Sequence, residues 1–315
     1  MFLRRNEINE VLWNQFIEAS PQGCIYFYTW YLDIVCPNWS AIVIGNENNW
    51  NALIPLPVSQ KMGISYALQP LFAQYLGVLF RPQTGKMVTQ WSNKKSWCEA
   101  IIRCLPSSLK LFNFTFSPQF DYPIPFYWKD YQITNKYTYW LSLKPSLPTL
   151  QQNFRTSVRK AILKCEKAGI RHHITSDIHH IIQFAKKQKQ FLADIHYEKL
   201  PVLWEVLQEK GKGLAIEMRD TQGKLHTGGL FLKDKNRWIN LFGCNANPDS
   251  KAIGAGAAML AQAILMAKEA GMEYFDFEGS MLEGVERFYR NFGGNPIPYI
   301  QVSKNTFPPP LKWIM

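Results

Sequence analysis

The sequence lacks the cysteine spacings of disulfide-rich and zinc-ribbon proteins. Its six cysteines lie far apart, and no two of them form a Cys-x-x-Cys pair. This spacing argues against a secreted disulfide framework and against a zinc ribbon. We therefore expect a protein of the reducing cytoplasm.

Long apolar runs are also missing. The N-terminal segment contains Glu7, Glu10 and Glu18 where a signal peptide needs an uninterrupted apolar stretch. The longest uncharged apolar runs, residues 64–80 and 252–267, are shorter than the roughly 20 residues of a membrane-spanning helix. The sequence predicts neither an export signal nor a membrane span.

What the chain does have is enough apolar material for large cores and an excess of positive charge. Its 315 residues are 47% hydrophobic, which suits about two domains of ~100–200 residues each. The net charge is +11, and residues 144–315 carry 24 Lys and Arg against 16 Asp and Glu, or +8 of that total. Such an excess suits an anionic partner, whether a phosphate-bearing cofactor, a nucleic acid or a lipid headgroup.

The apolar pattern predicts a mixed α/β fold with a domain boundary near residue 140, giving domains 1–140 and 141–315. The first half shows short strand-like segments and one helix at 95–105; a strand at 137–143 leads into the second half. There we predict helices at 150–168, 177–191, 201–210, 255–270 and 283–292, and strands at 214–219, 225–232, 238–244, 274–278 and 298–302.

The strongest local signal is a glycine-containing turn between a strand and a long helix, Lys251-Ala-Ile-Gly254-Ala-Gly256-Ala257. Glycines let backbone amides face a ligand, and the positive end of the following helix favours an anion such as pyrophosphate. The structural alternative is that Gly254 and Gly256 only allow close packing of the helix on its neighbours.

These residues resemble the GNAT acyltransferases, whose acyl-CoA loop reads Arg/Gln-x-x-Gly-x-Gly/Ala at the start of a helix. Lys251 replaces the usual arginine or glutamine, and the segment Phe288-Tyr-Arg-Asn-Phe-Gly-Gly294 resembles a further family signature. The resemblance covers residues ~200–302 and implies a central splayed mixed sheet flanked by helices. It also implies a donor site formed by the loop (Lys251, Gly254, Gly256, Ala257) and the preceding strand end (Phe242, Gly243, Cys244).

The chain is similar, more narrowly, to the Fem-like subgroup with tandem GNAT domains. The similarity lies in the tandem arrangement, the basic helix at 150–168 and the strand end Phe275-Asp-Phe-Glu-Gly-Ser280. Well-known members of this subgroup move amino acids from aminoacyl-tRNA onto peptidoglycan precursors and do not depend on acyl-CoA. The resemblance implies a degenerate N-terminal domain that shapes the acceptor cleft.

Three residues are candidates for catalysis. In the family, the tyrosine that matches Tyr289 is often the general acid for the departing thiolate; a phenol with an ordinary pKa gives up that proton uphill by roughly 2 kcal/mol. We therefore expect Arg287 or Arg290 to lower the pKa of Tyr289. Strand alternation places Asp276 and Glu278 on one face, where either can act as the base for an amine acceptor. The alternatives are structural roles for Tyr289 and Asp276.

Two residues outside this set are further candidates, each with a more common structural explanation. Glu217, on the predicted hairpin, is a third candidate base, although an exposed strand carboxylate is the more common case. Cys244 is a conceivable nucleophile, but no histidine stands in a partnering motif, and a buried strand cysteine is more common.

A basic segment offers an anion-binding surface. Residues 151–171 contain six basic residues and one acid, a net charge of +5. Arg155, Arg159 and Lys160 lie on helical ridges that can contact phosphates of tRNA or of a lipid-linked pyrophosphate. The alternative is an ordinary solvated face. The histidine pairs at 172–173 and 179–180 lack a completing acidic or cysteine cluster, so we predict no metal site.

The sequence thus predicts an N-acyltransferase that moves an acyl group from acyl-CoA to an amine by direct attack. One alternative is a Fem-like aminoacyl transferase that uses aminoacyl-tRNA and acts on a cell-wall precursor. Another is a binding module that kept the fold without turnover, because a fold does not fix a function.

Overall fold

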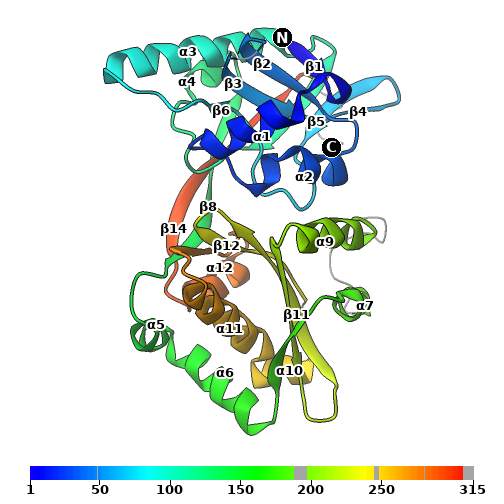
Figure 1. Ribbon diagram of the computed structural model, residues 1–315, viewed down its shortest axis with the longest axis vertical. Coiled ribbons are helices and arrows are strands. Elements are labelled where there is room, and N and C mark those ends of the chain that lie inside the picture. The colour runs from blue at the N-terminus through cyan, green and yellow to red at the C-terminus, as the bar shows by residue number, and fades with distance from the viewer. Residues whose placement is uncertain (48, 188–196, 245–247, 280, 308–315) are drawn as a thin grey trace. The chain divides into compact units, whose positions relative to one another are not determined.

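The computed structural model describes residues 1–47, 49–187, 197–244, 248–279 and 281–307 (Figure 1). The end of the helix predicted at 177–191, residues 245–247 of the predicted loop and Ser280 lie outside the described residues. The chain divides into two compact units, Met1–Lys136 with Pro298–Met315, and Tyr137–Ile297. The predicted second domain instead ran to residue 315. The last strand joins the first unit because residues 301–305 pair with residues 111–115.

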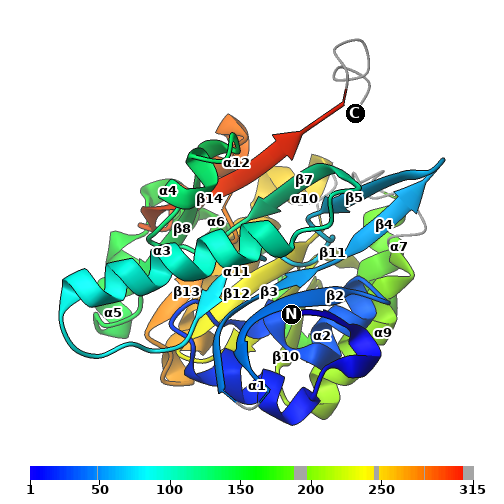
Figure 2. The same ribbon diagram turned by 90° about the horizontal axis from the view of Figure 1, so that it is seen from above.

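The first unit combines strands with helices on both sides. Its elements are β1 (Phe2–Arg4), α1 (Glu10–Ala19), α2 (Thr29–Val35), β2 (Ser40–Asn46), β3 (Asn49–Leu56), β4 (Val58–Lys61), β5 (Ile64–Leu68), β6 (Leu79–Phe80), α3 (Met87–Cys104), β7 (Leu109–Thr115) and α4 (Ile124–Tyr127). One sheet has the order β1-β2-β3-β6, and β5 pairs with β7 in parallel. Figure 2 shows α3 on one side of β2 and β3, with α1 and α2 on the other.

Two strands run across the boundary between the units, β8 (Gln132–Ser142) and β14 (Asn295–Asn305). The second unit then contains α5 (Leu147–Asn153), α6 (Thr156–Lys167), β9 (Arg171–Thr175), α7 (His179–Lys187), α9 (Lys199–Glu209), β10 (Gly213–Arg219), β11 (Leu225–Asp234), β12 (Arg237–Gly243), α10 (Pro248–Ile253), α11 (Ala255–Glu269), β13 (Tyr274–Asp276) and α12 (Glu283–Arg290). The predicted mixed α/β fold is confirmed.

The sheet of the second unit has the order β8-β13-β12-β11-β10-β9. Only β12 and β13 pair in parallel within this series; β9 to β12 and β13 to β8 pair antiparallel. In Figure 1, α11 and α6 lie on one side of β11, and α7 and α9 lie on the other. The helices therefore cover both faces of the sheet.

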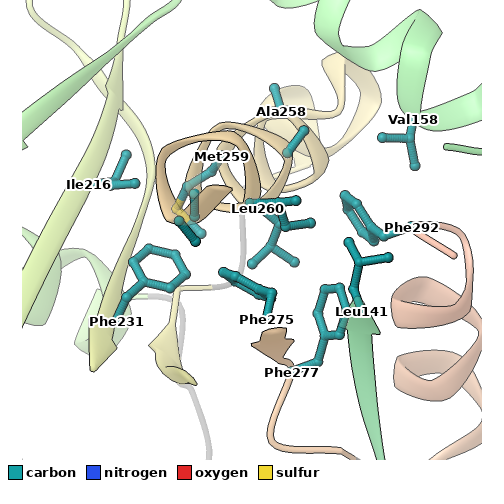
Figure 3. Packing of buried hydrophobic residues seen from close by; sticks show 14 of the residues in the cluster. Leu141, Val158, Ile216, Phe231, Ala258, Met259, Leu260, Phe275, Phe277 and Phe292 are labelled. Atoms are coloured by element: carbon teal, nitrogen blue, oxygen red, sulfur yellow. The ribbon is translucent and has the colours of Figure 1, made fainter. Parts of the chain in front are cut away.

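The core of this unit forms between α11 and the sheet. Figure 3 shows Phe231, Phe275 and Phe277 beneath Met259 and Leu260 of α11. The alanine-rich α11 presents little side-chain bulk, so α6 packs closely against it. The helix ends as predicted at Gly271, whose φ of +75° suits glycine and whose N–H donates to the carbonyl of Lys268.

The helix predicted at 95–105 begins earlier, at Met87, and the strand predicted at 298–302 is longer, Asn295–Asn305. Two boundaries near the candidate site were also wrong. The single helix predicted at 150–168 is α5 followed by α6. The break falls at Phe154, whose ring is buried against Phe292, and at Arg155, whose N–H donates to the carbonyl of Asn291 at 2.8 Å. The strand predicted to reach Glu278 stops at Asp276 because the backbone of Glu278 has a φ of +60°.

Candidate functional site

The central parallel pair of strands opens at its carboxyl end. Strands β12 and β13 share three register pairs, from Arg237–Tyr274 to Ile239–Asp276. After these pairs β13 ends, whereas β12 continues to Gly243. The parallel register therefore ends at Ile239, and β12 extends beyond β13; we call this place, where the donor is predicted to bind, the opening.

A β-bulge lies in β12 beside this opening. Phe242 pairs with Leu230 and Asn240 pairs with Phe231, so Leu241 is the extra residue. A bulge interrupts the hydrogen-bonding ladder and can turn a backbone amide toward a ligand. The bulge lies next to Phe242 and Gly243, where the sequence predicts the amides that would polarise a donor carbonyl.

Cys244 does not offer such an amide. Its N–H donates to the carbonyl of Gly228 at 2.8 Å, and its thiol donates to the carbonyl of Ile181 at 3.2 Å. Burial raises the pKa of the Cys244 thiol to about 12, so it is not a nucleophile at neutral pH. A Cβ built at Gly243 would have no atom within 4 Å, so the backbone there borders open space.

Tyr289 lies against the opening. Its ring stacks on Phe277 with 5.1 Å between centroids, and Asn240 donates to its hydroxyl at 3.4 Å. Burial, followed by the negative charge of Glu278, raises the pKa of Tyr289 to about 12. The expected lowering by Arg287 or Arg290 was wrong: both arginines are exposed, and Arg290 pairs with Glu286 at 3.1 Å.

Asp276 holds the backbone rather than facing a substrate. It is 0% exposed, and one carboxylate oxygen accepts from the Thr138 hydroxyl at 2.8 Å and from the Glu278 N–H at 2.9 Å. Arg237 lies 3.8 Å from the other oxygen. Burial raises the pKa of Asp276 against the pull of this arginine. We therefore assign Asp276 a positioning role in the turn that carries Glu278.

Glu278 is the carboxylate that comes near Tyr289, since its charge raises the pKa of that phenol. It is half-buried and follows the strand end. Its φ of +60° is unusual for a residue with a side chain, and such strain gathers at functional sites. Because β13 ends at Asp276, strand alternation does not set the direction of the Glu278 side chain, and its role as the base stays a prediction.

The two glycines before α11 have different surroundings. Gly254 has a φ of +89°, a Cβ there would lie 2.5 Å from the Cβ of Ala161, and its N–H donates to the carbonyl of Ser250 at 3.0 Å. Gly256, by contrast, borders open space, with no atom within 4 Å of an added Cβ. Gly254 therefore serves helix packing, and only Gly256 keeps the open position that a phosphate cradle needs.

A short helix occupies the rest of the expected loop. Lys251 lies exposed on α10, and the half-buried Ala257 donates its N–H to the carbonyl of Gly254 at 3.0 Å. Ser250 on α10 is fully buried, and its hydroxyl lies 2.8 Å from Nδ1 of His226, whose Nε2 lies 3.1 Å from Asp220. Because Ser250 is inaccessible, this serine–histidine–aspartate chain anchors α10 to β11 and is not a nucleophilic triad.

The basic segment keeps its exposed face. Arg155 precedes α6 and is partly engaged, because its guanidinium donates to the side chain of Asn291 at 3.2 Å. Arg159 donates to Thr156 at 3.3 Å, and both Arg159 and Lys160 are exposed. Val158, Ala161 and Cys165 form the buried face of α6. The cationic side chains thus point away from the core.

Sequence reasoning missed Asn240. It is 8% exposed, contacts Tyr289 and has an amide oxygen without a hydrogen-bond partner among the described residues. Buried amides are normally paired, so this group suits a bound polar ligand. The available signal was a lone amide within the apolar strand Trp238-Ile-Asn-Leu-Phe242.

Glu217 also departs from expectation, because it is 4% exposed rather than a surface carboxylate. It accepts from Arg219 at 2.7 Å on the face covered by α7.

In the part of the chain that the structure describes, no group of three or more His, Cys, Asp or Glu side chains is arranged to hold a metal, and no helix is long and apolar enough to cross a membrane. None of the six cysteines, which all lie among the described residues, is joined in a disulfide.

Comparisons of sequence give no match: no family model matches the chain, and no curated protein is significantly similar to it. Comparisons of structure do. The chain resembles the crystal structure of FemX with a TM-score of 0.65 at 12% identity, covering 93% of this chain and 96% of that one.

Two further solved structures resemble it over nearly their whole length. L-PGS from Bacillus licheniformis matches with a TM-score of 0.56 at 10% identity, covering 98% of this chain and 95% of that one. A tandem GNAT protein from the clavulanic acid biosynthesis pathway matches with a TM-score of 0.53 at 9% identity, covering 98% and 99%. The protein therefore has a GNAT-like fold, and its structural relatives include Fem-like and tandem GNAT proteins.

Proposed function

We propose that this protein transfers an acyl group from an ester donor of the aminoacyl-tRNA type to an amine, at the opening between β12 and β13. The observation that carries the proposal is the environment of Tyr289. Its hydroxyl stands at the opening beside Asn240 and Glu278, and its pKa is raised to about 12.

The raised pKa separates the two donor classes. A proton passing from a phenol at about 12 to a thiolate at about 8.5 goes uphill by 3.5 units, or roughly 5 kcal/mol. An ester donor releases an alkoxide, whose conjugate acid is far weaker than a thiol; the corresponding value for water is about 15.7. Tyr289 can therefore protonate a sugar oxygen readily and a CoA thiolate only with difficulty.

The loop before α11 supports the same choice. A pyrophosphate cradle needs free backbone amides, but the amide of Gly254 is already hydrogen-bonded and α10 takes the place of the open loop. The engaged amide of Gly254 removes one donor from the expected acyl-CoA cradle, and we assign no step to that cofactor. The exposed cations of α6, Arg159, Lys160, Lys164 and Lys167, suit the phosphates of a tRNA instead.

Within this proposal each residue has a defined part. Glu278 accepts the proton of the attacking amine, Tyr289 gives its proton to the departing sugar oxygen, and Asp276 fixes the turn that holds Glu278. The bulge at Leu241 supplies a backbone amide for the donor carbonyl. The Fem-like resemblance favours an amine of a cell-wall precursor as the acceptor, with the first unit contributing to acceptor binding.

Transfer of acyl groups from acyl-CoA is the second candidate, favoured by the open space at Gly256. The test compares donors directly: transfer from charged tRNA and from acetyl-CoA to amine acceptors, with wild type, Tyr289→Phe, and Tyr127→Phe as a matched control at an exposed tyrosine. We expect activity with charged tRNA that falls at least ~100-fold in Tyr289→Phe, is unchanged in Tyr127→Phe, and weakens steeply with salt.

A thermal-shift titration with acetyl-CoA and CoA tests the second candidate, acyl-CoA as the donor. A saturable rise in melting temperature that Gly256→Trp abolishes would replace the ester donor by acyl-CoA. Binding of charged tRNA without transfer to any amine, together with wild-type behaviour of Tyr289→Phe, would favour a non-catalytic module.

A further inference from the structure

The first unit contains a cavity that the proposed transfer site does not use. Its volume is about 310 Å³, the space of roughly ten water molecules at ~30 Å³ each. Leu105, Leu109 and Phe112 supply an apolar wall, and Tyr131, Lys129 and Lys304 supply polar groups. This size admits a small molecule.

Tyr131 presents an unused hydroxyl to this cavity. The residue is 8% exposed, yet among the described residues its hydroxyl has no hydrogen-bond partner. Its ring is fixed edge-on between Phe112 and Phe126, with centroids 5.6 Å and 5.4 Å away. Burial raises the pKa of Tyr131 to about 12, so the phenol stays a proton donor at neutral pH. Tyr131 lines the cavity, where a ligand can accept a hydrogen bond from its hydroxyl.

Lys304 places a positive charge over the ring of Tyr131. Its ammonium donates to the carbonyl of Lys129 at 2.7 Å and lies 5.0 Å from the centre of the Tyr131 ring. These two contacts hold the ammonium in place while leaving further N–H donors for a ligand. Lys129 lines the same cavity, and the single acid there, Asp130, leaves a net positive charge.

We propose that this cavity binds a small amphiphilic anion, a carboxylate or phosphate monoester with an apolar body, with its charged end on Lys304 and Tyr131 and its body against Leu105, Leu109 and Phe112. The two head groups share the chemistry that the cavity recognises, a compact oxyanion that accepts from an ammonium and a phenol. This inference concerns the first unit alone and does not depend on the proposed transfer.

Calorimetric titration of the full chain tests it with four probes. Benzoate and phenyl phosphate carry both parts, benzyl alcohol lacks the charge and inorganic phosphate lacks the apolar body. We expect one or both complete probes to bind saturably and at least about tenfold more tightly than either half probe. The tighter complete probe identifies the head group.

Three variants locate the binding. Lys304→Met keeps the apolar stem and should remove the preference for anions, and Tyr131→Phe keeps the packed ring and should weaken binding about tenfold. Lys110→Met, at an exposed lysine outside the cavity lining, should bind as wild type does. The proposal is overturned by an absence of saturable binding up to about 10 mM, by equal binding of benzyl alcohol, or by equal losses in Lys110→Met and Lys304→Met.

Discussion

Gly254 and Gly256 stand two residues apart in one motif, yet alanine should affect folding stability in opposite directions at the two positions. Gly254 has a left-handed backbone and an added Cβ would lie 2.5 Å from the Cβ and 3.3 Å from the Cα of Ala161. Gly256 borders open space and lies in the first turn of α11. The pair therefore separates a packing glycine from an open one.

The magnitudes follow from these surroundings. At Gly254 the left-handed conformation costs an alanine about 1–2 kcal/mol, and the forced contact with Ala161 adds about 1–3 kcal/mol. Gly254→Ala should therefore lower the free energy of unfolding by roughly 2–5 kcal/mol. Gly256→Ala removes flexible backbone from a helix at no steric cost and should raise it by up to about 1 kcal/mol.

Urea unfolding followed by circular dichroism measures both values. A double variant, Gly254→Ala with Ala161→Gly, checks the cause, because it removes the close contact but keeps the left-handed backbone. It should recover the steric part, allowing about 1 kcal/mol for the glycine placed in α6. If the two single variants differ by less than about 0.5 kcal/mol, the assignment of Gly254 to packing is refuted.

Other substitutions test the site. Asp276→Ala should cost about 1–3 kcal/mol of stability, because it removes the acceptor of the buried Thr138 hydroxyl; urea unfolding measures this, and a loss below about 0.5 kcal/mol would contradict the positioning role. Stability should fall between pH 10 and 12, since Tyr289 ionises near 10 when unfolded and near 12 when folded, a difference worth up to about 2.7 kcal/mol; a Tyr289→Phe variant that keeps the whole decline would refute this. Iodoacetamide at pH 8 should modify Cys244 at least ~100-fold more slowly than the less buried Cys36, as peptide mapping would show.

Much of the second unit followed from local pattern. The hairpin of β10 and β11 was predictable from the sequence because apolar residues alternate on either side of the turn at Asp220–Gly223. Helix α11 was predictable from the sequence because its residues favour a helix and Gly271 ends it. These features depend on neighbours in sequence, which is the range over which a single sequence is informative.

The errors arose where distant residues decide the local structure. The break between α5 and α6 depends on the carbonyl of Asn291 and the ring of Phe292, both more than 100 residues away in the chain. The return of β14 to the first unit depends on its pairing with β7. No local pattern contains either partner.

The candidate site shows the same limit more sharply. The position of Tyr289 in a helix after the strand was predictable, but its pKa was expected to fall and instead rises. Nearby arginines in the sequence suggested a positive environment, whereas the folded chain brings Glu278 near the phenol and leaves the arginines outside. Electrostatics at a buried group depends on which side chains the fold brings together.

Glu278 and Gly279 are consecutive residues with a left-handed backbone, at φ +60° and +59°. Close packing explains this conformation only at Gly279. A Cβ at Gly279 would lie 2.4 Å from the carbonyl of Tyr137, so glycine is required there. At Glu278 the same backbone costs about 1–2 kcal/mol that glycine would avoid. If the strained backbone is tolerated because the Glu278 carboxylate takes part in transfer, Glu278→Gly should preserve or raise the free energy of unfolding measured in urea. The same variant should lower acyl transfer at least ~100-fold. A variant that is both more stable and fully active would show that the carboxylate takes no part in the chemistry, and the base would then have to come from the acceptor or from another residue.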